Sequence, residues 1–143
     1  ALYTSHMTGL TAMLADSLAL GALDVALLCL TGLIAFVAGA ATCALVFNWA
    51  RRRGLRSRYA VVLLLEAVLA LVIGFVAHEF TADGRSWALI ALLGFTMGLQ
   101  NAVITKISGA QIRTTHVTGM VTDIGIELGK LLYPRRTGDP DPV

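Results

Sequence analysis

Two short stretches of the chain repeat the same potentially reactive residues. Ser5-His6-Met7-Thr8-Gly9 recurs as Thr115-His116-Val117-Thr118-Gly119. Imidazoles can shuttle protons or bind a metal, and a Thr-Gly step suits a helix that is broken within a membrane, because threonine can hydrogen-bond the freed carbonyls. The alternative is an ordinary helix start, with Ser5 or Thr115 as the N-cap. Two histidines are too few ligands to predict a metal site, so we expect neither a metal nor a cofactor.

A carboxyl group and two amides lie inside otherwise apolar runs. Glu66 interrupts the run 59–77, and Gln100 with Asn101 lies deep in the run 86–105. An ionisable group at bilayer depth costs at least about 2.5 kcal/mol, which makes it a functional candidate. Glu66 is predicted either to relay a proton or cation, or to lie near the lipid headgroups, where a loop arginine neutralises its charge. The amides either contact a small polar solute or hydrogen-bond between helices.

The segment 115–132 carries a polar stripe beside an apolar one. Asp123, Glu127 and Lys130 share the polar face with His116, and Asp16 is the acidic residue of the first copy. This stripe is either a cation site inside a bundle or a solvated face with a Glu–Lys pair. We expect it to face the interior, the alternative being an interfacial helix. The predicted solute or ion path comprises His6, Thr8, Gly9, Asp16, Glu66, Gln100, Asn101, His116, Thr118, Gly119, Asp123 and Glu127.

The elements that must hold these groups are membrane helices. Of the 143 residues, 57% are hydrophobic and 14% charged, well below the roughly 25% of a soluble domain. Residues 1–133 are predicted to form one all-α, polytopic transmembrane bundle with an internal two-helix repeat. A tail, 134–143, is predicted to be disordered. The expected helices cover 5–23, 25–50, 59–77, 86–105 and 115–132.

Basic residues set the expected orientation. Five of the eleven lysines and arginines, at 51, 52, 53, 56 and 58, lie in one short loop between apolar runs, as is typical of a cytoplasmic loop. We therefore expect a multi-pass protein of the bacterial inner membrane, with the lipid bilayer as its main partner and a homo-oligomer as a further possibility. Because the positive charge is confined to loops, no nucleic-acid partner is expected.

Small residues recur at helical spacing in several runs. They predict close helix packing, within one chain or between chains. Cys29 and Cys43 lie in the same run and are expected to be buried, inert thiols. The glycines expected at packed helix surfaces are Gly39, Gly94, Gly98, Gly125 and Gly129.

Three stretches carry a resemblance to the YoaK family of bacterial inner-membrane proteins. They are Ser5 to Gly9, the Gly-Phe-Thr-Met-Gly-Leu-Gln-Asn-Ala run that ends at Ala102, and Arg113 to Gly119. The first copy departs from the family pattern, because Leu10 stands where the family has asparagine. The resemblance extends to about Leu132. It implies that an additional apolar helix precedes the first motif in the family, so that this chain lacks the first helix of its first repeat.

No hydrolase, P-loop, zincin or dinucleotide motif is present, so we do not expect an enzyme. We expect a transporter or permease that binds a small solute or ion at the repeat interface, because internal repeats and broken helices are typical of transporters. The alternative is a non-transporting membrane scaffold whose glycine stripes bind partner helices.

Overall fold

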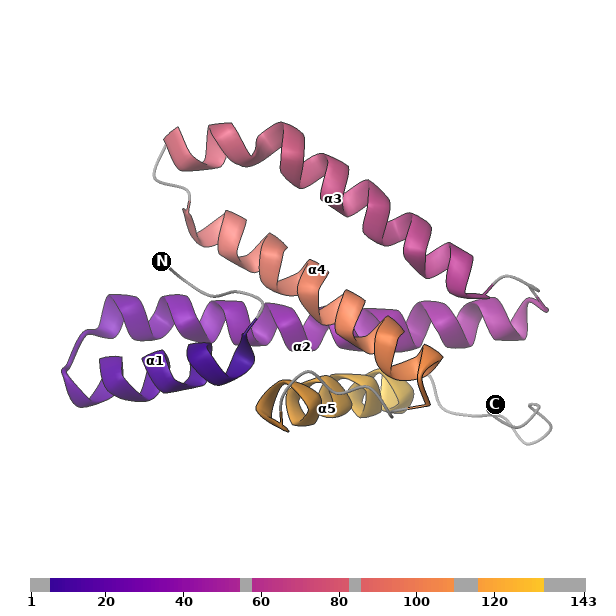
Figure 1. Ribbon diagram of the computed structural model, residues 1–143, viewed down its shortest axis with the longest axis horizontal. Coiled ribbons are helices and arrows are strands. Elements are labelled where there is room, and N and C mark those ends of the chain that lie inside the picture. Colours follow the sequence, from indigo (N-terminus) through magenta and orange to yellow (C-terminus); the bar gives the residue numbers. More distant parts are fainter. Residues whose placement is uncertain (1–5, 55–57, 83–85, 110–115, 133–143) are drawn as a thin grey trace.

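The longest helix, α2 (Leu23–Arg52), lies at the centre of the molecule and contacts every other helix of the described chain. The structure is a computed structural model that describes residues 6–54, 58–82, 86–109 and 116–132. Figure 1 shows α2 extending along the whole length of the molecule. The residues that pack on α2 therefore determine the arrangement of the fold.

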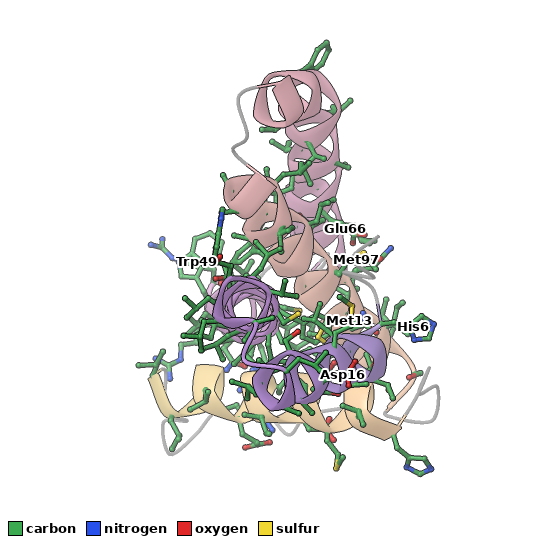
Figure 2. All side chains as sticks on the ribbon, turned by 90° about the vertical axis from the view of Figure 1, so that its left-hand side faces the viewer. His6, Met13, Asp16, Trp49, Glu66 and Met97 are labelled. Carbon is green, nitrogen blue, oxygen red and sulfur yellow. The ribbon has the colours of Figure 1, made fainter. Side chains whose placement is uncertain are left out.

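The remaining helices lie on two sides of α2. On one side α4 (Ser86–Ile107) packs on α2, with α3 (Arg58–Ala82) outermost. On the other side lie α1 (Met7–Ala19), which runs back along the first half of α2, and α5 (His116–Leu132), which crosses α2 (Figures 1 and 2). The all-α class expected from the sequence is confirmed for the described residues.

The helices differ from the expected ranges mainly at the ends of α1 and α3. Helix α1 ends at Ala19 because Gly21 takes a left-handed conformation at φ 70°. The Ala22 N–H donates to Ser17 O at 2.8 Å and the Gly21 N–H to Leu18 O at 3.3 Å, the paired bonds of a Schellman motif. With 13 residues, α1 is about 20 Å long and shorter than a bilayer core. Helix α3 continues to Ala82, beyond the end expected at residue 77. The tail from 134 lies outside the described residues.

Helices α2 and α4 pack in parallel with their backbones in contact. A Cβ added to Gly94 would lie 2.7 Å from Gly32 O, and one added to Gly98 would collide with Phe36 O. Further along both helices, the Lys106 ammonium lies 4.8 Å from the Phe47 ring centroid. Because these contacts advance in the same direction on both helices, the two run parallel, and α3 is the return segment between them.

Two groups of buried residues fill the space around α2. One joins α2 to α3, α4 and α5, and the other joins α2 to α1, with α4 and α5 packed at its edge. The first contains Ala40, Cys43, Ala44, Val62, Leu99, Ala102, Val103 and Ile126. The second contains Met7, Leu10, Cys29 and Phe36.

The outer surface is rich in large apolar side chains. Phe75 is 85% exposed, and further aliphatic residues are exposed on every helix. Such a surface suits lipid and is unusual for a protein in water. Within the described residues, Leu23–Arg52 and Trp87–Ile107 are long and apolar enough to cross a membrane, and Tyr59–Phe75 is a shorter apolar segment. Of the five helices expected in the bundle, two thus have the length and composition of a span in the part of the chain that the structure describes.

Candidate functional site

A buried thiol on α2 has an ionisable side chain on α3 and another on α4 within electrostatic range. The Cys43 thiol of α2 is buried, and it lies within electrostatic range of Glu66 on α3 and of Lys106 on α4. Glu66 and Lys106 are both partly buried. We call Cys43, Glu66 and Lys106 the polar cluster, because each belongs to one of the three apolar helices.

Helical spacing accounts for this arrangement. On α4, Lys106 follows Gly94, Gly98 and Ala102 at intervals of one turn, so it extends the small-residue face that packs on α2. On α2, Phe47 follows Cys43 at the same interval, and the Lys106 ammonium lies over its ring. The attraction between a cation and an aromatic face stabilises the α2–α4 contact at the end where Lys106 lies.

The polar cluster lies near the ends of the helices that adjoin the basic α2–α3 loop. Cys43 precedes Arg51 and Glu66 follows Arg58 by the same number of residues, which corresponds to about 12 Å of helix. Both therefore lie at a similar distance from the basic α2–α3 loop. Lys106 is nearer that end, beside Phe47. At this end of the bundle, the Glu66 carboxyl group of α3 and the Lys106 ammonium group of α4 both lie within electrostatic range of the Cys43 thiol of α2.

The hydroxyl and amide groups of the apolar helices mostly bond to their own backbone. Asn101 Nδ2 donates to Met97 O at 2.8 Å, and Thr105 Oγ1 donates to Asn101 O at 2.8 Å. Thr122 Oγ1 likewise donates to Thr118 O at 2.7 Å. These bonds to the preceding turn satisfy polar groups without a partner helix. Asn101 and its partly buried neighbour Gln100 thus line α4 near the second core group.

The repeated motifs are brought together through their apolar residues. Met7 is fully buried in the second core group, and Val117, its counterpart in the second copy, packs against that same group. The two histidines, His6 and His116, are exposed. In Figure 2, His6 points away from the bundle while Met13 and Met97 lie nearer α2.

The other motif residues differ between the copies. Thr8 is exposed, whereas its counterpart Thr118 is buried at 2% exposure, and the motif glycines Gly9 and Gly119 are both partly buried. Asp16 is exposed on α1. The motif residues therefore do not occupy equivalent environments, although α1 and α5 share one side of α2.

Helix α5 uses a small-residue face to contact α2. A Cβ added to Gly125 would lie 2.6 Å from Ala40 Cβ, and one added to Gly129 would lie 2.5 Å from Ala41 O. The polar stripe lies elsewhere: Glu127 and Lys130 are exposed and form an ion pair at 2.6 Å. Their arrangement is the solvated Glu–Lys pair that the sequence left as an alternative. Asp123, on the same stripe, is partly buried.

No cluster of three or more histidine, cysteine or acidic side chains that could hold a metal occurs in the part of the chain that the structure describes. The expected path residues are thus divided between the cluster at Glu66, the amides of α4, and residues of α1 and α5 that range from exposed to buried. Among these groups, the polar cluster is the strongest candidate for a functional site, because its charged side chains are partly buried.

Two members of this cluster were not among the residues that the sequence singled out. Lys106 was not among the expected path residues, and Cys43 was expected to be a buried, inert thiol. The four-residue spacing of Gly94, Gly98 and Ala102 continues to Lys106 and could have identified it, because a residue on a packed face cannot point into open solvent. No pattern in the sequence relates Cys43 to Glu66, because the two residues lie on different helices.

The fold thus defines an all-helical protein with two helices long and apolar enough to span a membrane. The family model described as protein of unknown function DUF1275 matches residues 1–141, and the chain belongs to this family. The resemblance to the YoaK family is confirmed, because that family is known under this domain. The comparisons with curated proteins and with solved structures returned no match.

Proposed function

We propose that the protein carries a small ion, with protons as the first candidate, across a bacterial inner membrane through the contact between α2, α3 and α4. The observation that carries the proposal is the placement of Glu66 and Lys106 on different apolar helices around Cys43. Ionisable residues are expensive inside a membrane and commonly mark ion and proton pathways.

The chemistry of the pair suits a coupled site. Glu66 and Lys106 each lie within electrostatic range of the Cys43 thiol, so a change in the charge of either residue alters the potential at that buried group. When Glu66 takes up a proton or binds a cation, the cluster becomes positively charged, and the balance between its helices changes. A transported cation would thereby change the electrostatic potential where α3 and α4 meet α2, which is a simple way to link occupancy to helix movement.

The scaffold alternative is weakened by the way in which the glycines are used. Gly39, Gly94 and Gly98 each face backbone atoms across the α2–α4 contact, and Gly125 and Gly129 face α2 from α5. These stripes are therefore already occupied within one chain. A scaffold would have to bind its partners through the exposed apolar faces instead.

Flux measurements test the proposal. The full-length protein, reconstituted in liposomes containing a pH-sensitive dye, should pass protons when a potassium diffusion potential is imposed. We expect Glu66→Gln to reduce the flux to that of protein-free vesicles, because the amide cannot ionise, and Lys106→Met to reduce it as well. Sodium and potassium gradients measured with their own dyes extend the test to other cations.

Asp24→Asn provides the matched control for the flux assay. Asp24 is exposed at the start of α2, so the same loss of a carboxylate should leave the flux unchanged. Equal flux in the wild type and in Glu66→Gln would contradict the proposal, as would the absence of flux for all three cations.

The parallel course of α2 and α4 also supports a topology. If both cross the bilayer in the same direction, the chain must return between them, and α3 is the helix that the described part of the chain has there. Its 25 residues extend about 37 Å, enough for a hydrocarbon core of roughly 30 Å. We propose that α2, α3 and α4 all cross, with the Arg51 to Arg58 loop cytoplasmic. Trp49 and Trp87 then lie near opposite interfaces, where tryptophan is enriched.

Cysteine labelling from each side of the membrane tests this topology. We expect Arg53→Cys to react with an impermeant maleimide only in inverted vesicles, and Ala22→Cys and Ala88→Cys only in intact cells. All three positions are exposed, and the native Cys29 and Cys43 are buried, so the background should be low. Labelling of Ala88→Cys from the same side as Arg53→Cys would show that α3 does not cross.

A further inference from the structure

Three side chains near the basic α2–α3 loop connect α2, α3 and α4 through two contacts. The Lys106 ammonium of α4 lies 4.8 Å from the centroid of the Phe47 ring on α2. The Phe47 ring lies 5.2 Å from the Tyr59 ring of α3, centroid to centroid, with the two ring planes inclined at 51°. Both distances are in the range of favourable contacts for a cation over a ring and for two rings. We call Phe47, Tyr59 and Lys106 the bridging layer, because Phe47 connects the other two helices to α2.

The bridging layer lies one helical turn beyond the first group of buried residues. Each of the three helices contributes a buried residue to this end of the group, namely Ala44, Val62 and Val103. Phe47 and Lys106 follow the buried residue of their own helix by three positions, and Tyr59 precedes that of α3 by three, because α3 runs in the opposite direction. All three members of the layer are therefore nearer the basic loop than this part of the core.

Cys43 and Glu66 lie on the inner side of this layer. Phe47 follows Cys43 by about one turn on α2, and Glu66 follows Tyr59 by about two turns on α3, so the rings are closer to the basic loop than the thiol and the carboxyl group. Cys43 is fully buried, whereas Phe47 and Tyr59 are partly buried. The rings are thus in position to separate the polar cluster from that end of the bundle.

One of the three helices is held less closely than the other two. Gly39 and Gly98 bring the backbones of α2 and α4 into contact, whereas a Cβ added to Gly74, the glycine of α3, would meet nothing within 4 Å. Helix α3 is also outermost in Figure 1. Because Tyr59 lies in the first turn of α3 (Arg58–Ala82), a displacement of this end of α3 would separate its ring from Phe47 without breaking the contact between α2 and α4.

We propose that the bridging layer is a gate, which closes the polar cluster from the cytoplasmic side and opens when the first turn of α3 moves away from α2. The inference rests on the proposed function, because a gate matters only where an ion passes. The contact between Phe47 and Tyr59 opens, and the contact between Phe47 and Lys106 stays with the fixed pair of helices. Local opening of a weakly packed helix end requires less free energy than separation of the α2–α4 contact.

Labelling of Cys43 with a charged, water-soluble methanethiosulfonate tests the gate in the full-length protein. In a Cys29→Ser background, Cys43 is the remaining thiol of this sequence. In inverted vesicles, whose outer face is the cytoplasmic one, we expect Tyr59→Ala and Phe47→Ala each to accelerate the labelling several-fold over the parent. Tyr59→Phe keeps the ring and should react at the parent rate. Mass spectrometry of the purified protein measures the labelled fraction, and circular dichroism checks that each variant is folded.

Trp49→Ala is the matched control, since it removes a ring with its own cation contact from the same end of α2. Arg53 lies 5.7 Å from the Trp49 centroid, but it caps α2 itself, so this contact connects no second helix. Trp49→Ala should therefore label at the parent rate. Equal acceleration in Trp49→Ala and Tyr59→Ala would indicate general loosening and overturn the gate, as would a parent rate in both Tyr59→Ala and Phe47→Ala. Labelling requires no ion flux, so a failed gate leaves the flux result standing, and the reverse also holds.

Discussion

Gly98→Ala should destabilise the folded protein by about 3 kcal/mol, near the upper end of the usual range for overpacking. The added methyl group would collide with the Phe36 carbonyl across the α2–α4 contact. A collision with a backbone atom cannot be relieved by a change of side-chain rotamer, so the two helices must separate. Gly39→Ala should behave in the same way, because its methyl group would collide with Phe95 O.

Gly74→Ala makes the same chemical change without the collision. Nothing lies within 4 Å of a Cβ at Gly74 on α3, so alanine should stabilise that helix by about 0.5–1 kcal/mol. Unfolding by increasing sodium dodecyl sulfate in mixed micelles, followed by circular dichroism, measures both variants. Similar midpoints for Gly98→Ala and Gly74→Ala would rule out the close contact between α2 and α4.

Phe36→Ala should produce the second large effect, a loss of about 3–5 kcal/mol. Phe36 is fully buried, and it belongs to the core group that holds α1 against α2. Removal of the ring would leave a cavity beside Met7 and Leu10, which cannot close without a shift of α1. We therefore expect increased hydrogen exchange in α1 in addition to the lower midpoint.

Phe75→Ala is the counterpart at the surface. Phe75 is 85% exposed on α3, so the same truncation should change the stability by no more than about 0.5 kcal/mol. The same unfolding titration applies. If the two phenylalanine variants lost equal stability, Phe36 could not occupy the buried position described for it.

Much of the helical architecture could be predicted from the distribution of charge. The absence of charged residues from 25–50 and from 86–105 was sufficient to locate α2 and α4, because charged residues are excluded from spans. The end of α1 was not predicted. The left-handed turn at Gly21 that stops the helix there depends on the backbone bonds that close it.

The packed face of α5 was harder to predict. Ile124, Leu128 and Leu131 form an apolar stripe, yet all three are exposed, and Gly125 and Gly129 contact α2 instead. In water an apolar stripe identifies the buried face. In lipid it does not, because the surroundings are as apolar as the core, and small residues that allow close approach are the better guide.

The candidate site was predicted in part for a related reason. Glu66 was identified because a carboxyl group stands out in an apolar run. Lys106 directly follows the uncharged run 86–105, so its residue type alone did not distinguish it from a lysine in a loop. Only the parallel contact between α2 and α4 places it beside Phe47 and Cys43.

The central position of α2 has a consequence for biosynthesis. The ribosome completes α2 long before it makes α4, and before α5 it must also make α4 and the segment that follows it. During that interval the glycine and alanine faces of α2 that pack on α4 and α5 lack those partners, so the nascent chain must hold α2 as an incomplete assembly. A factor that escorts newly inserted helices would therefore recognise α2, and truncation before α4 should leave a product that cellular proteases remove.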